Sequence, residues 1–283
     1  MKTIVITGSA ALIGSPLCHR FLKLGYRVVG IDNLIGGYVT NMPNQDSMFV
    51  YFTEDILNNK KISSILKFYS PELVIHCAAL AHEGLSVFSP KTIVENIYSG
   101  TASIVSAAVS AKVSTIINTS SMARYGNAQA PFTEDYTKPT PVDPYGLAKL
   151  HAEQHINLMS DIYGFKAFHM VPHNVCGPHQ CYSDPFRNVM SIFANRVLHE
   201  KPVYVYGDGS QKRSFSHIED CVDAYTTLYA LKDQIDSGNV FNIGPDDGSE
   251  ITVNELAILV HKYFNRQPDI IHIAERPREV KDA

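Results

Sequence analysis

The sequence lacks a strong charge of either sign and lacks a long hydrophobic run. Its 24 Lys and Arg stand against 28 Asp and Glu, so the formal net charge is −4, and no block of like charge forms a tail. This balance argues against a nucleic-acid surface. No apolar stretch approaches the length that spans a bilayer, and the first apolar run is too short for a signal peptide. We therefore expect a cytoplasmic protein that does not contact membranes.

Cysteine pairs are also lacking. The five cysteines are odd in number and no two of them form a Cys-x-x-Cys motif: Cys18, Cys77, Cys176, Cys181 and Cys221. This pattern predicts reduced, mostly buried thiols. No internal repeat or low-complexity linker occurs. With 283 residues and 45% hydrophobic content, the chain can bury a large core, as one large α/β unit or as two unequal lobes.

The chain begins with the pattern of a strand, a helix and a second strand. Residues 2–7 and 26–31 are rich in β-branched side chains, and residues 13–24 have helical apolar spacing. Between the first two elements, Gly8 would make a tight turn and Gly14 would allow close helix packing. Backbone N–H groups and the helix dipole are then left to hold a pyrophosphate.

Two further positions bear on this site. Ala11 stands where a dinucleotide fold usually has Gly, which weakens the motif. Asp32 follows the second strand, eighteen residues after Gly14, and is placed to accept hydrogen bonds from an adenosine ribose. A carboxylate there should repel a 2′-phosphate, so the sequence favours NAD over NADP. The alternative is a glycine turn in an α/β protein that binds no nucleotide.

Strand and helix patterns continue to alternate up to residue 171. We expect strands at 48–52, 73–79, 115–119 and 165–171, and helices at 63–69, 89–109 and 144–163. The fully apolar strand at 73–79 is typical of parallel sheets. It ends in Ala78 and Ala79, which are small enough for a backbone to lie against a cofactor, although ordinary packing also explains them. Asn96 interrupts an apolar helix face, for which loop capping is the alternative explanation.

The candidate acid–base group follows the strand at 115–119. That strand delivers Ser120 and Ser121 to the carboxyl edge of the sheet, where α/β sheets bind ligands. If Pro144 opens a helix, Tyr145 and Lys149 lie on one face of it. The pKa of a free tyrosine is about 10 and must fall towards neutrality in a base, for which we expect the Lys149 ammonium, helped by a second positive charge such as a nicotinamide ring, to be the source. An isolated Tyr-x-x-x-Lys pair occurs by chance, so the prediction depends on this context.

From Pro172 onwards the composition is rich in turn residues, and we place a domain boundary there. Residues 1–171 would form an α/β domain with a doubly wound parallel sheet, and residues 172–283 mainly a smaller α+β substrate lobe. Segments near 213–245 are expected to return to the first domain. Within 172–283 we expect helices at 188–198 and 253–264, short strands at 203–206, 240–243 and 270–273, and an extended piece at 213–218.

Taken in order, these motifs resemble the extended short-chain dehydrogenase/reductase superfamily, and within it the nucleotide-sugar epimerases of the UDP-glucose 4-epimerase type. The resemblance runs nearly end to end. It is carried by Thr7-Gly8 through Gly14, Asp32-Asn33-Leu34, Asp55-Ile56, His76-Cys77-Ala78-Ala79, Ser120 to Gly126, Tyr145 with Lys149, Asn174 to Pro178, Gly207-Asp208-Gly209 through Arg213-Ser214-Phe215, Asn242-Ile243-Gly244 and Arg276-Pro277. It implies a Rossmann-type NAD domain.

The resemblance also implies roles for individual residues. Tyr145 would take the proton of a sugar 4-hydroxyl, Ser121 would hydrogen-bond the same oxygen, and Lys149 would hold the ribose and lower the pKa of Tyr145. The cofactor contacts that it implies are Gly8, Leu12, Ile13, Gly14, Asp32, Asn33, Asp55, Ile56, Ala78, Ala79, Asn96, Thr119, Tyr145, Lys149, Pro172 and His173. On the substrate side, a diphosphate would be held by Asn174, Asn188, Arg213 and Arg276, and Tyr206 would stack on the base.

Some positions depart from the family pattern. Met122 and Ala123 lack the acidic residues that related 4,6-dehydratases and decarboxylases carry after the serine, which argues against dehydration and decarboxylation. Ala283 would stand at the position that limits the C2 substituent, so a 2-acetamido sugar could fit. Arg124 could contact an acidic sugar or lie on the surface. His151 and His155 stand four apart, but no third ligand is evident, so we predict no metal.

The predicted function is NAD-dependent epimerisation at C4 of a nucleotide-diphosphate sugar, of the UDP-glucose/UDP-galactose type, with 2-acetamido or uronic acid forms left open. One alternative is a net NAD-dependent reductase of a nucleotide-linked keto-sugar. Another is a non-catalytic NAD sensor or scaffold. The resemblance also implies a homodimer that forms through the helices at 89–109 and 144–163.

Overall fold

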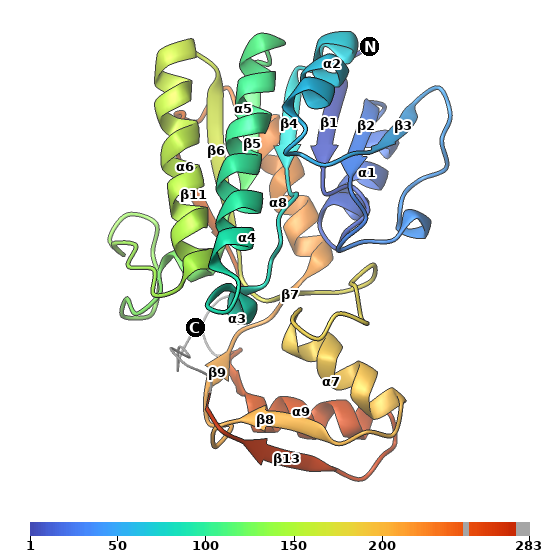
Figure 1. The fold of residues 1–283 in the computed structure, drawn as a ribbon, viewed down its shortest axis with the longest axis vertical. Coiled ribbons are helices and arrows are strands. Elements are labelled where there is room, and N and C mark those ends of the chain that lie inside the picture. Colours follow the sequence, from blue (N-terminus) through green and yellow to red (C-terminus); the bar gives the residue numbers. More distant parts are fainter. Residues whose placement is uncertain (246–248, 276–283) are drawn as a thin grey trace.

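The computed structural model of this chain describes residues 1–245 and 249–275. Its centre is a parallel seven-stranded sheet in the order β11-β6-β5-β4-β1-β2-β3 (Figure 1). The strands are β1 (Thr3–Thr7), β2 (Arg27–Asp32), β3 (Phe49–Thr53), β4 (Leu73–His76), β5 (Thr115–Thr119), β6 (Lys166–Pro172) and β11 (Val240–Ile243). The strand order reverses between β1 and β4, which defines a doubly wound Rossmann-type sheet and confirms the predicted fold class.

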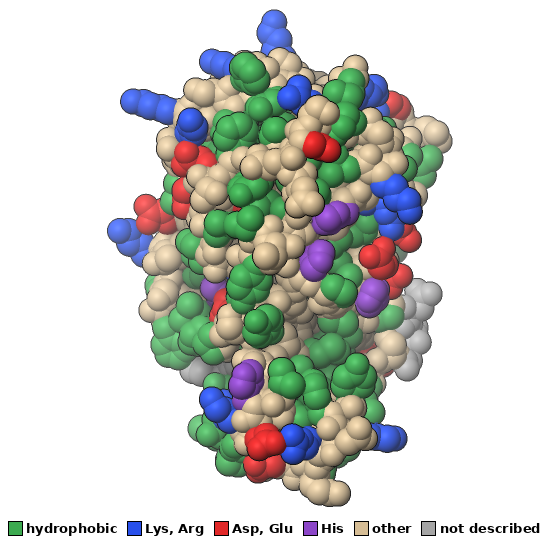
Figure 2. All heavy atoms as spheres, turned by 90° about the vertical axis from the view of Figure 1, so that its right-hand side faces the viewer, with side chains coloured by type: hydrophobic (Ala, Val, Ile, Leu, Met, Phe, Trp, Pro, Cys, Tyr) green, Lys and Arg blue, Asp and Glu red, His purple; other side chains and the backbone are tan. Residues whose placement is uncertain are grey.

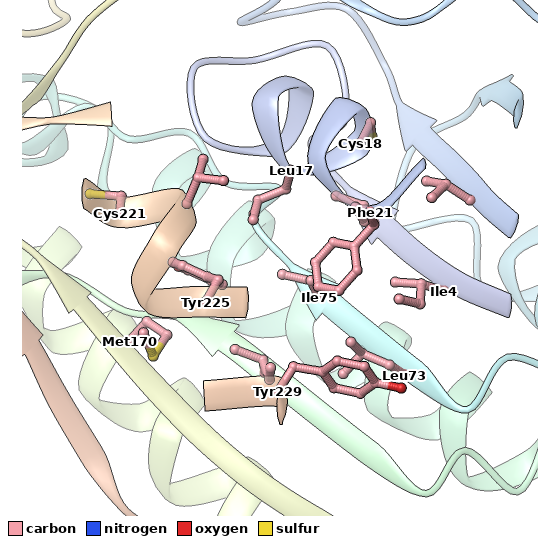
Figure 3. Packing of buried hydrophobic residues seen from close by; sticks show 14 of the residues in the cluster. Ile4, Leu17, Cys18, Phe21, Leu73, Ile75, Met170, Cys221, Tyr225 and Tyr229 are labelled. Carbon is pink, nitrogen blue, oxygen red and sulfur yellow. The ribbon is translucent and has the colours of Figure 1, made fainter. Parts of the chain in front are cut away.

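Helices cover both faces of the sheet because its strands are apolar on both sides. One face carries α1 (Gly14–Lys23) and α8 (Ile218–Leu231), and the other carries α2 (Asn59–Tyr69), α5 (Gly100–Ser110) and α6 (Pro144–Tyr163). Figure 3 shows Phe21 of α1 and Tyr225 and Tyr229 of α8 gathered over Ile4 and Ile75 of the sheet. These side chains are buried, and they fix α8 against α1 although about 200 residues separate the two helices.

A smaller lobe lies below the sheet in Figure 1. It contains α7 (Val189–Leu198), β8 (Val203–Tyr206), α9 (Val253–Tyr263) and β13 (Ile270–Ile273), and β8 pairs with β13 in parallel. The lobe has its own core, in which Phe193 and Val197 of α7 meet Leu256 and Ala257 of α9. Two short pairings connect the regions, β7 (Val175–Cys176) with β10 (Ser216–His217) and β9 (Lys212–Arg213) with β12 (Ile251–Thr252).

The predicted strand at 73–79 is too long, since β4 ends at His76. After it the backbone leaves the ladder, and the N–H of Ala78 donates to Thr7 Oγ1 at 3.2 Å. The predicted helix at 89–109 is interrupted. It consists of α4 (Pro90–Val94), a π-helical turn η2 (Glu95–Ser99) and α5, and the turn contains Asn96, whose Oδ1 accepts from the N–H of Leu80. Such π-turns are frequent near functional sites.

One helix was not predicted. The segment expected to be extended up to residue 218 ends at β10, and α8 begins at Ile218 with His217 as its N-cap. Its buried residues recur at helical spacing, at Ile218, Cys221, Val222, Tyr225, Leu228 and Tyr229, so the signal was present in the sequence. The remaining elements are three short helical turns, η1 (Val39–Asn41), α3 (Glu83–Ser86) and η3 (Met122–Arg124).

Three observations concern the expectations about nucleic acid, membranes and metal ions. Acidic and basic side chains are interspersed over the face that Figure 2 shows. Within residues 1–245 and 249–275, no helix is both long and apolar enough to cross a bilayer. Over the same residues, no three or more His, Cys, Asp or Glu side chains are grouped so that they could hold a metal ion.

Candidate active site

A cavity of about 200 Å³ lies at the carboxyl ends of β1, β2 and β4. Ten of the sixteen predicted cofactor residues line it: Gly8, Leu12, Ile13, Gly14, Asp32, Asn33, Ile56, Ala78, Ala79 and Asn96. The expected position of the ligand, at the edge where the strand order reverses, therefore coincides with an open volume in the protein.

The glycine turn between Gly8 and Gly14 lines one side of this cavity. Gly8 has φ +71°, and a Cβ there would lie 2.8 Å from the backbone nitrogen of Ala78, while a Cβ on Gly14 would overlap the carbonyl oxygen of Gly8. The helix that follows has no side-chain cap at Ile13 and no acidic residue in its first turn. Among the described residues, the N–H groups of Leu12 and Ile13 have no hydrogen-bond acceptor. An uncapped helix N-terminus of this kind fits the phosphates of a dinucleotide.

Asp32 is held at the rim of the same cavity. Its Oδ2 accepts from the N–H of Ala10 at 2.9 Å, and its Oδ1 accepts from the N–H of Leu34 at 2.7 Å. Burial raises the pKa of Asp32, and the two N–H groups and the charge of Arg187 oppose that rise. Each carboxylate oxygen keeps a lone pair, so the fixed side chain can still accept from the hydroxyls of a ribose.

The serine, the tyrosine and the lysine come together beside this cavity. Helix α6 starts at Pro144, and Asp143 caps it by accepting from the N–H of Gly146 at 2.9 Å. Tyr145 and Lys149 are both buried on the inner face of α6. Ser121 forms a hydrogen bond with the Tyr145 phenol, and Lys149 Nζ donates to the carbonyl of Thr119 at 2.8 Å. The three side chains therefore meet at the carboxyl end of β5.

The expected lowering of the Tyr145 pKa is not found in the protein alone. Burial raises the pKa of Tyr145 to about 12; the hydrogen bond from Ser121 opposes this, while Glu83 and Asp143 raise the pKa further. Lys149 is not among the groups that lower it. Its Nζ lies 6.0 Å from the centre of the Tyr145 ring and faces the Thr119 carbonyl, and burial lowers the pKa of Lys149 itself to about 8.

A second, smaller cavity of about 50 Å³ is lined by Glu83, Met122, Ala123, Gly126, Phe132, Asn174 and Arg213. Asn174 has φ +30°, and its Nδ2 donates to the carbonyl of Ser214 at 2.9 Å, which fixes its side chain. Tyr145 belongs to one buried apolar cluster with Ala123, which lines the small cavity, and Ala79 and Leu80, which line the large cavity, pack against that cluster. Tyr145 itself is not among the lining residues of either cavity.

Other predicted site residues lie elsewhere. Asn188 lines the large cavity, not the small one with Asn174 and Arg213, and it caps α7 by accepting from the N–H of Met190. Neither cavity is lined by Asp55, Thr119, Pro172, His173 or Tyr206, although His173 Nδ1 is buried without a partner among the described residues. Arg276 and Ala283 lie outside the described residues.

Sequence reasoning missed Arg187 and the role of Glu153, and it left the position of Arg124 open. Arg187 lines the large cavity, and no motif singled it out. Arg124 is neither at a sugar site nor on the surface, because it is buried in an ion pair with Glu153, with 2.9 Å between Nη2 and Oε2. Glu153 also accepts from the hydroxyl of Ser120. Its position four residues after Lys149, on the same helix face, was a signal for this role.

This arrangement defines a class of protein. A doubly wound sheet, a glycine turn, a carboxylate at the end of the second strand and a Ser/Tyr/Lys set at one sheet edge are the features of an NAD-dependent enzyme of the short-chain dehydrogenase/reductase type. The chain belongs to the NAD dependent epimerase/dehydratase family, whose model matches residues 4–244.

Individual relatives agree with this assignment. The chain is 31% identical to UDP-glucose 4-epimerase of Mycolicibacterium smegmatis, over 90% of this chain and 80% of that protein. The fold matches UDP-glucose 4-epimerase of Thermotoga maritima, solved with UDP-glucose, with a TM-score of 0.89, 28% identity, and 99% and 88% of the two chains covered. It also matches UDP-glucose 4-epimerase of Thermus thermophilus, solved with NAD, with a TM-score of 0.89, 26% identity, and 99% and 89% covered. The cofactor of the present enzyme is NAD.

Proposed function

We propose that the protein is an NAD-dependent 4-epimerase of a nucleotide-diphosphate sugar, most simply a UDP-linked hexose. The observation that carries the proposal is that Tyr145, hydrogen-bonded by Ser121, shares one buried cluster with residues that line the large cavity and with Ala123 of the small cavity, which Asn174 and Arg213 also line. A sugar carbon bound there would face both a base and the cofactor. The similarity to two UDP-glucose 4-epimerases of known structure supports the choice of reaction.

In this proposal each residue has one task. The Tyr145 oxygen takes the proton of the sugar 4-hydroxyl, and Ser121 donates a hydrogen bond to the same oxygen as it becomes a ketone. Bound NAD supplies reversible hydride acceptance at C4 and a positive ring charge. Arg213 and Asn174 hold the diphosphate, so that the 4-keto sugar can turn over without leaving. Tyr145 would then give the proton back to the C4 oxygen while C4 regains, on its opposite face, the hydride that the cofactor had accepted, so the sugar ends with C4 inverted and no net change of oxidation state.

The chain offers less support for the other reactions of the family. Dehydration and decarboxylation need an additional acid or base beside the serine. Met122 and Ala123 occupy that part of η3, and both line the small cavity without an ionisable group. Glu83 lines the same cavity, but it comes from a different segment, the start of α3.

The test is to give the purified protein UDP-glucose, UDP-N-acetylglucosamine and UDP-glucuronate, and to follow the 4-epimers by proton NMR. We expect at least one pair to equilibrate without net NADH absorbance. Stoichiometric NADH consumption with a keto-sugar would instead indicate the reductase. Tyr145→Phe should lower the epimerisation rate by about 10²- to 10⁴-fold while NAD stays bound. No conversion of any of the three would overturn the proposal.

We also propose a homodimer that forms through α4, η2 and α6. Leu147, Leu158 and Ile162 form one outward stripe on α6, and the last two are 59% and 61% exposed. The ring of Tyr98 on η2 lies beside His151 and His155 of α6, next to this stripe. A second copy of the same face would bury these apolar side chains. Light scattering coupled to size exclusion should give twice the chain mass, and Ile162→Glu should give the monomer.

A further inference from the structure

An arginine side chain lines the NAD cavity, in addition to the backbone groups of the glycine turn. Of the described residues that line it, the charged ones are Asp32, Glu54 and Arg187, so Arg187 provides the single positive side chain. Its guanidinium carbon lies 3.0 Å from the position that a Cβ on Gly36 would take, so the guanidinium packs against the loop after β2 at Gly36.

Asp184 and His82 hold Arg187 from a second side. We call these three residues the Arg187 cluster. Arg187 Nε donates to Asp184 Oδ2 at 3.0 Å, and His82 Nε2 lies 2.7 Å from the same oxygen. The three side chains are only 13%, 16% and 9% exposed. The cluster joins the loop after β4 to the segment between β7 and α7, two parts of the chain about 100 residues apart.

The cluster fixes Nε and leaves the rest of the guanidinium available. Within the described part of the chain, the Nε bond to Asp184 is the single hydrogen bond that the Arg187 side chain makes, so the two Nη groups keep their donors. The same charge lowers the pKa of Asp32 at one end of the site and that of Tyr145 at the other. Arg187 thus lies within electrostatic range of both the ribose carboxylate and the catalytic phenol.

We infer that Arg187 binds the diphosphate of NAD, and that Asp184 and His82 orient it for this contact. The diphosphate connects the adenosine held by Asp32 to the nicotinamide end beside Tyr145, so it must cross the region between them. A guanidinium with two free Nη groups fits two phosphate oxygens, which backbone N–H groups alone would not neutralise. Ala11 makes this contact more important, because its methyl group keeps phosphates further from the turn than glycine does.

The test compares NAD affinity in Arg187→Met, Arg187→Lys and the wild type by isothermal titration, after removal of copurified cofactor. Loss of a charge-assisted contact should raise the Kd for NAD by about 10- to 100-fold in Arg187→Met, and Arg187→Lys should recover part of the affinity. The Kd for ADP-ribose should rise by the same factor, because ADP-ribose contains the same diphosphate. This readout does not depend on which sugar the enzyme converts.

Two further variants separate the contact from general damage. Arg20→Met is the matched control, because Arg20 on α1 pairs with Glu219 and Asp223 and does not line the cavity. It should leave the Kd for NAD within about twofold. Asp184→Ala should weaken NAD binding severalfold by releasing Arg187. An unchanged Kd in Arg187→Met, or equal losses in Arg187→Met and Arg187→Lys, would overturn the inference, as would a loss of UDP affinity alone.

Discussion

Tyr145 is the base of the proposed reaction, and its surroundings keep its phenol neutral in the protein alone. Burial removes the water that would stabilise a phenolate and raises its pKa to about 12. Two carboxylates, Glu83 and Asp143, act in the same direction, and Ser121 and Arg187 act against them. In the proposed reaction this phenol would ionise readily only when a positive charge enters the site, so proton transfer would be coupled to the bound cofactor.

Glu83 gives a prediction at this scale. Its carboxylate lines the small cavity and raises the pKa of Tyr145, so Glu83→Gln should lower that pKa. A lower pKa means that the phenolate persists to lower pH, and the acid limb of the kcat/KM profile should move to lower pH. The same change removes a like charge from the sugar site, so the ratio of kcat/KM for UDP-glucuronate to that for UDP-glucose should rise about 5- to 50-fold.

Steady-state assays with both substrates between pH 5 and 9 would check this. Glu95→Gln, a change on the exposed part of η2, serves as the control and should alter neither quantity. An unchanged substrate ratio together with an unchanged pH profile would show that Glu83 does not face the sugar.

Single residues also show where sequence reasoning succeeds and where it ends. Gly8, Gly14 and Asp32 could be placed in advance, because each is required by a local backbone conformation or by its distance from a strand end. Arg187 could not, since its partner His82 lies 105 positions earlier and the two meet only through Asp184. The high pKa of Tyr145 in the protein alone could not be read from its spacing to Lys149, because it follows from burial, which depends on tertiary packing.

The turn between β1 and α1 lines the large cavity, where we propose that NAD binds, and it gives a second prediction. Gly14→Ala would place a methyl group against the Gly8 carbonyl and force α1 away from the turn. We expect the Kd for NAD to rise at least about tenfold and the melting temperature to fall. Ala11→Gly is the matched variant at the same turn, and it should retain or improve NAD affinity because it allows closer approach of the phosphates. Equal effects of the two changes would contradict this account.

Helix α6 gives a third prediction, through the buried pair of Glu153 with Arg124 of η3. Glu153→Ala would leave a buried guanidinium without its carboxylate and should lower the free energy of unfolding by about 3–5 kcal/mol. The double variant Glu153→Leu with Arg124→Met removes both charges and should lose much less. Denaturant titrations of both variants would measure this. A double variant as unstable as the single one would mean that packing, not charge, is what Glu153 supplies.

The elements differ in how well the sequence predicted them. Helix α6 has the bounds that were expected, because Asp143, Pro144 and Gly164 mark its ends with standard capping chemistry. The π-helical turn of η2 has no such local marker, since Asn96 makes its contact to Leu80 across space. Helix α8 does have the apolar spacing of a helix. It was missed because the sequence was interpreted as extended up to residue 218, where the helix in fact begins, and no helix was predicted directly after that point.

At the scale of the whole molecule, the sheet is completed by a late part of the chain. β11 pairs with β6, and α8 covers the face opposite α6, so residues after 215 contribute to the core around the NAD cavity. Sequence patterns give the fold class because strand–helix alternation is local. They do not fix which later strand joins the sheet, because that depends on pairing partners about 70 residues apart.

Two histidines inside this core give the last prediction. His76 of β4 and His169 of β6 are fully buried, and burial lowers the pKa of each to about 3. Below pH 6.5 the unfolded chain protonates these imidazoles while the native state does not, so the unfolded state binds more protons between pH 6.5 and about 3. Stability must therefore fall as pH falls through that window, by up to about 1.4 kcal/mol per pH unit for each histidine.

His169→Gln should remove one of these two contributions. Gln can still donate to Asn157 Oδ1, which lies 2.8 Å from His169 Nε2, so the variant keeps a partner for the buried group. Urea unfolding between pH 4 and 6.5 should give a slope of stability against pH that is shallower by up to about 1.4 kcal/mol per unit, whatever the offset at pH 7. Parallel curves for the variant and the wild type would mean that His169 takes up a proton in the native core, and that the packing of β6 against α6 and α8 tolerates a charge.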